Sequence, residues 1–443
     1  MIIDFAVKNF LSFKDEVSFS MLAAKSVKEM EDSDNGCSNV SVIGQNNLRL
    51  LRTAAIYGAN GSGKSNLIQA FSFFQNFVID SFHNDGFLKD FNRNQFLFSS
   101  EKDDASAFEM TFIKDDTKYR YGFSIFGETI DKEWLFEQQA DAVKESYCFK
   151  RMDGEIVCNA KIFKVTKEAK ASTRNNALFL SVAALFNAET AIRIKNFFTA
   201  DMNIISGIKD NTVSVTAHKL NESEDMHKRI VAFMKYADFG IEDIRVEETL
   251  AERVSDIKDP ILRKLLGSGD YDQRPSEKKL RNVDIKSFHS EYDGETVSGL
   301  VSLDFGYESV GTIKTFAMIG PWLDTLMNGK VLIVDEFGAS LHTKLALELL
   351  RLFQSRLNNG SQLIVTTHDT NLLRKDLFRR DQIWFVEKDK YGVSDLYSLV
   401  EYKINQATSV RNDASFSKDY LAGKYGAIPH FGNIQQFIED YGR

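Results

Sequence analysis

Residues 54–65 read AAIYGANGSGKS, an apolar run that leads directly into a glycine-rich turn ending in Lys64 and Ser65. The turn matches the pattern GxxxxGK(S/T), in which glycines allow successive backbone N–H groups to point at phosphate oxygens. Apolar residues then recur at helical spacing from Leu67 to Val78, so the turn lies between a buried strand and a helix start. This setting favours a phosphate-binding loop over an ordinary glycine-rich turn.

The residues of this loop have separate expected tasks in holding ATP. Lys64 should reach the β and γ phosphates, and the hydroxyl of Ser65 should ligate Mg²⁺. The other residues expected to contact the nucleotide are Asn60, Gly61, Ser62, Gly63 and Asn66. The positive end of the helix that begins here would strengthen the attraction of the phosphates.

A pair of acids follows a second apolar run, VLIV at residues 331–334. A phosphate-binding loop needs a carboxylate at a neighbouring strand end to hold the metal ion, and Asp335 stands in that place. Glu336 could instead face an attacking water and act as general base, because alternate residues of a strand point apart. The alternative is a strand that merely ends in two solvated acids.

Two further polar sites lie at predicted strand or helix ends. His368 follows the apolar run 363–367, and a histidine at the carboxyl end of a parallel strand faces the ligand crevice. It could hydrogen-bond the γ phosphate or the attacking water, although a lone histidine is more often structural. Ser309 and Gly311 precede an apolar helix and predict either a plain helix cap or a second anion site. Such a site lacks a lysine and would complete an ATP pocket only from a second subunit.

The pattern along the chain predicts an α/β fold in three parts. Residues 1–140 alternate with period two near 3–19 and 108–136, which predicts an antiparallel first lobe that also carries the phosphate loop. Residues 301–443 alternate apolar strands with helices, which predicts the parallel-sheet core. Residues 141–300 are mixed, and we expect an inserted, mostly helical arm that contacts a second subunit or a partner.

Composition limits the class of protein. The chain has 443 residues, of which 43% are hydrophobic and 27% charged, as is typical of a soluble globular protein. Its formal net charge is −8, so nucleic acid could bind only at a local basic patch. Three cysteines without a CxxC pair indicate a reducing compartment. No apolar run reaches the ~18 residues of a membrane span, and we expect a cytoplasmic protein without a membrane partner.

The order of these motifs resembles the ABC-type ATPase head, with Walker A at 58–65, signature at 308–312, Walker B at 331–336, D-loop at 339–342 and a switch histidine at 368. The opening FAVKNFLSFKDEVSF resembles the first hairpin of the SMC, RecF and OLD branch. Other stretches resemble the RloA-like and OLD-like AAA proteins of bacterial abortive infection, namely TRNNALFLSVAALFN (173–187), ADFGIEDIRVEE (237–248), ESVGTIKTF (308–316) and SKDYLAGKYGAIP (417–429). The resemblance covers nearly the whole chain.

The resemblance implies roles that spacing alone leaves open. Ser309 and Gly311 stand for the signature serine and second glycine, while Val310 and Thr312 replace the glycine and glutamine of the transporter pattern. Ser340 falls in the D-loop and joins the expected nucleotide contacts. Gln95 is the candidate for the Q-loop glutamine at the metal ion, or else a polar residue of a turn.

The resemblance also implies an activity and partners. The expected activity is ATP hydrolysis by a homodimer or higher oligomer closed around ATP, with a role in anti-phage defence. A separate effector such as a nuclease is expected, because the acids after His368 include no DxD pair for two-metal cleavage. A DNA repair or maintenance ATPase and an ATP-held scaffold with slow hydrolysis remain alternatives.

Two basic stretches could bind nucleic acid or could be solvated faces with acids interspersed. They comprise Arg374, Lys375, Arg379 and Arg380 after the histidine, and Lys278, Lys279, Arg281 and Lys286 in the arm.

Overall fold

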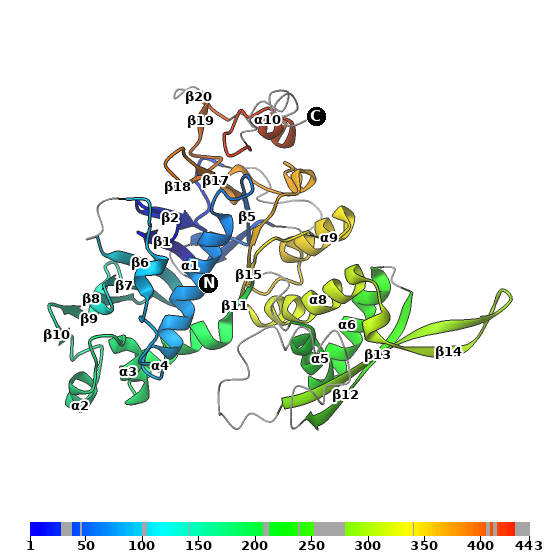
Figure 1. The fold of residues 1–443 in the computed structure, drawn as a ribbon, viewed down its shortest axis with the longest axis horizontal. Helices are drawn as coiled ribbons and strands as arrows, with labels where there is room; N and C mark the ends of the chain where they lie inside the picture. The colour runs from blue at the N-terminus through cyan, green and yellow to red at the C-terminus, as the bar shows by residue number, and fades with distance from the viewer. Residues whose placement is uncertain are drawn as a thin grey trace, which may run out of the picture.

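The computed structural model describes residues 1–27, 38–44, 47–99, 104–140, 142–206, 212–237, 240–251, 280–339, 341–404, 408–410 and 414–429. Two large sheets pack on opposite sides of one long helix, and further helices cover the outer face of the second sheet (Figure 1). This layering confirms the α/β class. None of the described helices is long and apolar enough to span a membrane.

The first sheet is antiparallel and has the strand order β10-β9-β8-β7-β6-β1-β2. Its strands are β1 (Ile2–Lys8), β2 (Val17–Ser20), β6 (Ser106–Lys114), β7 (Thr117–Phe126), β8 (Thr129–Gln138), β9 (Ser146–Met152) and β10 (Glu155–Cys158). Phe5 and Val7 face the core while Asp4 and Ala6 keep partial exposure, as alternation requires. The predicted antiparallel pairing of these strands is confirmed, but residues 53–57, which lead into loop 58–65, belong to the other sheet.

The second sheet has the order β11-β15-β16-β5-β17-β18, and every neighbouring pair is parallel except β17 with β18. Its strands are β5 (Thr53–Tyr57), β11 (Met202–Ile205), β15 (Val331–Val334), β16 (Gln362–Thr366), β17 (Ile383–Lys388) and β18 (Ser394–Ser398). The apolar runs that predicted buried parallel strands are therefore strands. Their carboxyl ends meet at one edge, which places the phosphate loop beside the acids and the histidine.

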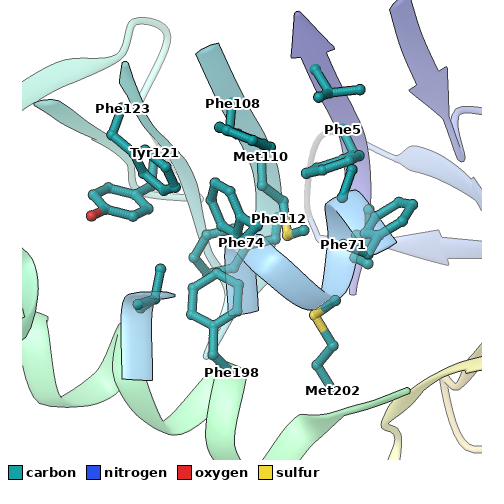
Figure 2. Packing of buried hydrophobic residues seen from close by; sticks show 14 of the residues in the cluster. Phe5, Phe71, Phe74, Phe108, Met110, Phe112, Tyr121, Phe123, Phe198 and Met202 are labelled. Atoms are coloured by element: carbon teal, nitrogen blue, oxygen red, sulfur yellow. The ribbon is translucent and has the colours of Figure 1, made fainter. Parts of the chain in front are cut away.

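Helix α1 (Lys64–Asp80) lies between the two sheets. Phe71 stacks on Phe5 with ring centroids 4.0 Å apart, and Phe74 stacks on Phe123 at 5.2 Å (Figure 2). Ile56 of β5 belongs to the same core, whereas its neighbour Tyr57 belongs to the core on the far side. Because α1 is packed on both sides, the loop that precedes it has a fixed position.

The far face of the parallel sheet is covered by α8 (Val310–Asn328) and α9 (Thr343–Gln354). Shorter elements complete the described part, and they are β3 (Val40–Ile43), β4 (Leu48–Leu51), η1 (Phe91–Asn94), α2 (Lys167–Ala171), α3 (Phe179–Leu185), α4 (Glu189–Asn196), η2 (Phe197–Asp201), η5 (Phe305–Tyr307), η6 (Thr370–Leu372), η7 (Arg380–Gln382), β19 (Lys403–Ile404), β20 (Thr408–Ser409) and α10 (Phe416–Leu421).

Residues 141–300 differ from the expected single, mostly helical arm. Strands β9 and β10 extend the first sheet, and β11 joins the parallel sheet. What projects is a mixed unit of α5 (Thr212–Glu222), α6 (Glu224–Tyr236) and the three-stranded sheet β12 (Ile241–Ala251), β13 (Leu280–Asp293) and β14 (Thr296–Asp304) (Figure 1). Strand β14 is exposed on both faces, so its sequence lacks the alternation that reveals a half-buried strand.

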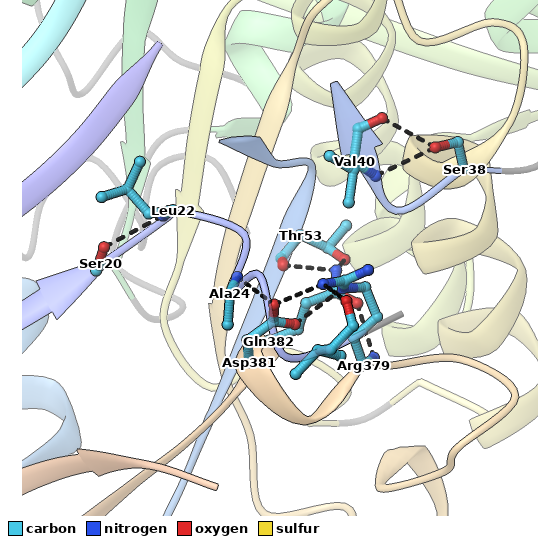
Figure 3. A network of polar contacts seen from close by, with 10 residues as sticks. Ser20, Leu22, Ala24, Ser38, Val40, Thr53, Arg379, Asp381 and Gln382 are labelled. Carbon is cyan, nitrogen blue, oxygen red and sulfur yellow. Dashed lines mark hydrogen bonds and ion pairs between the residues drawn. The ribbon is translucent and has the colours of Figure 1, made fainter. Parts of the chain in front are cut away.

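A buried ion pair ties the opposite end of the parallel sheet. Arg379 is 1% exposed, bonds Asp381 through Nε at 2.9 Å and Nη2 at 2.7 Å, and donates to the Val27 carbonyl. Gln382 donates to the carbonyl and hydroxyl of Thr53 at the start of β5 (Figure 3). Arg379 is thus unavailable to a phosphate backbone, which removes it from the suggested basic patch. Lys278 and Lys279 of the other patch lie outside the described residues.

Candidate functional site

Lys64 is held inside the glycine-rich loop. Its Nζ donates to the carbonyl oxygens of Gly58 and Ala59, both at 2.8 Å, and the residue is only 6% exposed. Burial lowers the pKa of Lys64 to about 8, against the opposing effect of Asp335 and Glu336. An anion in the loop would offer this ammonium stronger acceptors than two neutral carbonyls.

Gly63 shows why the loop needs glycine. It caps α1 with φ 117°, and a Cβ there would lie 2.5 Å from Ser394 Oγ and 2.8 Å from Ser12 Oγ. Those two hydroxyls bond each other at 2.7 Å, and Asn66 Nδ2 also donates to Ser12 Oγ at 2.7 Å. Ser65 sits half-buried in the first turn of α1 between these contacts. The loop is therefore braced from outside by residues far away in the sequence.

Ser62 contributes an unused polar atom to the loop. The residue is 3% exposed, and its Oγ has no hydrogen-bond partner among the described residues. This hydroxyl can therefore bond a group that enters the loop. Asn60 and Gly61 at the exposed tip join Ser62 in lining a cavity of about 280 Å³, whose other walls are residues 387–389 and 427–429.

Asp335 and Glu336 follow directly after β15. Thr366 of β16 organises them, since its Oγ1 donates to Asp335 Oδ1 at 2.5 Å and accepts the backbone N–H of Glu336 at 2.8 Å. Glu336 has a left-handed backbone with φ 54°, and its side chain is exposed. A non-glycine residue in this conformation is strained, and such strain gathers at functional sites.

His368 lies at the end of the adjacent strand β16 and contacts the backbone of Gly58. Desolvation is the main cause that lowers its pKa, although the ring keeps an exposed edge, and the charge of Lys64 lowers it further. Glu336 and Asp335 act in the opposite direction. The structure therefore brings His368, Lys64 and both acids within electrostatic range of one another.

Ser309 and Gly311 lie elsewhere, at the start of α8. Ser309 caps the helix, with its Oγ accepting the Thr312 N–H at 3.1 Å, and Gly311 accepts from Thr315 Oγ1 at 2.8 Å. The surroundings are open, since Val310 is 67% exposed. Within the described ranges, no hydrogen bond connects Ser309 or Gly311 with loop 58–65.

The remaining described candidate, Gln95, makes no hydrogen bond to the loop itself. Gln95 follows η1, and its Nε2 makes long contacts of 3.4 Å to the Asp104 carbonyl and to Ser106 Oγ. Ser106 Oγ in turn bonds the Asn9 carbonyl, three residues before Ser12. Gln95 therefore borders the segment that braces the loop. Ser340 lies outside the described residues.

Sequence reasoning missed three residues of this site. Thr366 stands in the run Thr366-Thr367-His368, and only the pairing of β16 with β15 reveals its contact with the acids. Ser12 lies in a stretch noted only for its resemblance to a first hairpin. Ser394 carries no sequence signal, because its contact with Ser12 spans 382 residues.

Comparison with solved structures returns chains of low sequence identity. An SMC head bound to the C-terminal winged-helix domain of ScpA has 13% identity and a TM-score of 0.45, covering 90% of this chain and 97% of that one. The SMC head domain from Thermotoga maritima has 14% identity and a TM-score of 0.39, covering 90% and 98%. The Smc head with an extended coiled coil, bound to the C-terminal domain of ScpA from Pyrococcus furiosus, has 12% identity and a TM-score of 0.41, covering 92% and 97%.

No curated protein matches the chain. Residues 54–374, more than half of the chain, match the family described as an AAA domain, putative AbiEii toxin, type IV toxin–antitoxin system. The match begins in β5 directly before the phosphate loop and extends past His368. It confirms the predicted AAA-type ATPase domain, and the chain belongs to this AAA-domain family.

Proposed function

We propose that the protein hydrolyses ATP at a site shared by two copies of the chain. The observation that carries the proposal is the gathering of Lys64, Asp335, Glu336 and His368 around one loop that contains a buried, unpartnered hydroxyl. The family match to an AAA domain supports nucleotide as the ligand. Cytoplasmic location and Mg²⁺ dependence are part of the same proposal.

Each residue has a task in this mechanism. Lys64 turns its ammonium from the loop carbonyls to the β and γ phosphates. Glu336 accepts a proton from the water that attacks the γ phosphate in line, and His368 hydrogen-bonds the γ phosphate or that water. Lys64 holds its charge where negative charge develops in the transition state.

The chemistry of the acids also fits a bound metal ion. Ser65 and Asp335 are oxygen ligands of the kind Mg²⁺ prefers, and Thr366 orients the Asp335 carboxylate. When bound, the ion would supply positive charge to the phosphate oxygens. Gln95 is a further proposed ligand, and its present contacts of 3.4 Å are long enough to exchange.

The second copy would supply the helix start at Ser309. Exposed Ser309 and half-buried Gly311 at a helix N-terminus offer backbone N–H groups to an anion. Within the described part of the chain, this helix start makes no hydrogen bond to the loop of its own chain. We therefore propose that it contacts the nucleotide bound in the loop of the second copy. The proposed dimer is thus closed by two ATP molecules.

The test is complementation between two inactive variants. Ser309→Arg places bulk and charge at the proposed contact and should abolish turnover while ATP still binds the isolated subunit. Lys64→Ala should abolish binding in its own loop. In a mixed dimer one composite site keeps both a normal loop and a normal Ser309, so mixing should restore turnover.

The measurement is phosphate release before and after mixing, with subunit exchange followed by fluorescence transfer between labelled chains. Random pairing with independent sites would restore about a quarter of the wild-type rate. Absence of any recovery despite exchange would exclude a shared site.

The family description further supports a role in controlling a toxic effector during phage infection. The test is phage plating on a host that carries the gene with its neighbours, compared with hosts carrying Glu336→Gln. We expect protection from the wild type and its loss in the variant. Equal plating on all hosts, including one without the gene, would contradict the defence role.

A further inference from the structure

Glu308 directly precedes the proposed signature serine and is turned away from solvent. Its side chain is 9% exposed, and its Oε1 accepts hydrogen bonds from Ser287 Oγ at 2.5 Å and from His289 Nε2 at 2.7 Å. Both donors belong to β13 of the projecting three-stranded sheet. Glu308, which precedes Ser309, is therefore hydrogen-bonded to the sheet β12-β13-β14.

Both ring nitrogens of His289 make polar contacts. Its Nδ1 lies 2.9 Å from the carbonyl oxygen of Gly240, which can only accept, so Nδ1 carries a proton and donates. The other ring nitrogen, Nε2, faces the Glu308 carboxylate. His289 therefore joins Glu308 to the backbone that leads into β12.

The parts on both sides of this contact are rigid. Ser287 is fully buried, and its Oγ also contacts the Leu303 carbonyl of β14. On the other side, Phe305 packs on Phe316 of α8 with centroids 4.7 Å apart. The short segment between Phe305 and Ser309 is thus held by the arm sheet at one point and by the helix at another.

We propose that Glu308 is a positioning residue for hydrolysis, which sets the place of Ser309 for the nucleotide bound by the second copy. The inference rests on the proposed shared site. Its chemical basis is that a misplacement of about 1 Å at a catalytic contact can reduce turnover on the order of 100-fold. The sheet β12-β13-β14, through Ser287 and His289, therefore sets the position of Ser309 of one copy relative to the nucleotide bound by the other.

The first experiment separates positioning from binding. Glu308→Ala should lower the turnover number at least tenfold, while the dissociation constant of ATP for the isolated subunit stays unchanged, because Lys64 is untouched. Glu308→Gln should retain most turnover, since an amide oxygen accepts the same two hydrogen bonds. The control is Glu291→Ala, which removes an exposed acid on β13 and should leave turnover as in the wild type.

The second experiment asks in which copy Glu308 acts. Mixed with Lys64→Ala, the Glu308→Ala chain contributes a normal loop that meets a normal Ser309 from its partner, so turnover should recover. If Glu308 served its own loop or only the fold, that site would stay defective. Should Glu308→Ala fail to fold, His289→Ala takes its place in both experiments.

The parallel mixture of Ser309→Arg with Lys64→Ala keeps this inference distinct from the proposed function. Recovery there without recovery for Glu308→Ala would overturn the inference and leave the shared site standing. Recovery in neither mixture would overturn both. Normal turnover by Glu308→Ala alone would also overturn the inference.

Discussion

The starts of α1 and α8 both offer backbone N–H groups to an anion, and they differ in almost every other respect. The start of α1 is buried, capped by Gly63 without any side-chain hydrogen bond, and has Lys64 as its first residue. The start of α8 is exposed, capped by Ser309 through the Thr312 N–H, and has no lysine in its first turn. The same physical device is thus built into two different surroundings.

The difference shows how a binding site can be divided. At α1 the glycine cap leaves its N–H groups to a ligand, and cation, acids and histidine surround them. At α8 the serine satisfies the helix end by itself, so the helix is stable with nothing bound. In the proposed dimer, the start of α1 would supply the chemical groups, and the start of α8 would supply the contact with the nucleotide of the other copy.

The largest expected effect concerns catalysis at the start of α1. Glu336→Gln should lower turnover by about 10²–10⁴-fold, because the amide cannot accept the proton of the attacking water. ATP and Mg²⁺ should still bind, since Lys64 and Asp335 remain. Phosphate release and an ATP binding isotherm measure the two quantities. A turnover equal to wild type would place the base elsewhere, and Glu348→Gln on α9 serves as the control.

Lys64→Ala tests ATP binding at the start of α1. The dissociation constant for ATP should rise by about 100-fold or more, because a charge-assisted contact to the phosphates is lost inside a buried loop. Calorimetric titration measures this constant. Lys375→Ala, which removes an exposed lysine after the histidine strand, should leave it unchanged. Unchanged affinity in the Lys64 variant would refute the role of the loop.

Thr366→Val sharpens the comparison, because it alters the order of the acids and leaves their charge. Valine has the shape of threonine but cannot bond Asp335 Oδ1 or accept the Glu336 N–H. We expect turnover to fall about 10–100-fold and half-saturation by Mg²⁺ to shift upward, as for other residues that orient a metal ligand. Thr366→Ser should restore both quantities. If valine had no effect, Thr366 would only fill space.

The smallest effect concerns pH and only the start of α1. Burial lowers the pKa of Lys64 to about 8, so in the empty loop the side chain is charged below pH 8 and neutral above it. Phosphate favours the charged form, and binding above pH 8 must take up a proton. The dissociation constant should therefore rise by up to about tenfold per pH unit above 8 and stay flat from pH 6 to 7.5. Titrations across this range check the slope, which Lys64→Ala should abolish.

Local spacing was enough to predict the phosphate loop, the acids and the strand ends, because each depends on residues adjacent in the chain. Thr366, Ser12 and Ser394 were missed, because their roles depend on contacts between separate segments. Thr366 and Asp335 are 31 residues apart, and Ser12 and Ser394 are 382 residues apart. The sheet β12-β13-β14 within the predicted arm was missed for another reason. Strand β14 is exposed on both faces, so burial imposes no pattern on its sequence.

The hydrogen bond between Ser12 and Ser394 has a consequence for folding during synthesis. It joins segments 382 residues apart, and Ser394 Oγ also donates to the Ser62 carbonyl within the loop. A nascent chain contains residues 58–65 early, but the brace that presses on Gly63 is missing until Ser394 has left the ribosome. The proposed nucleotide site would thus be completed late in synthesis, and tight ATP binding would indicate that the segments around Ser12 and Ser394 have already paired.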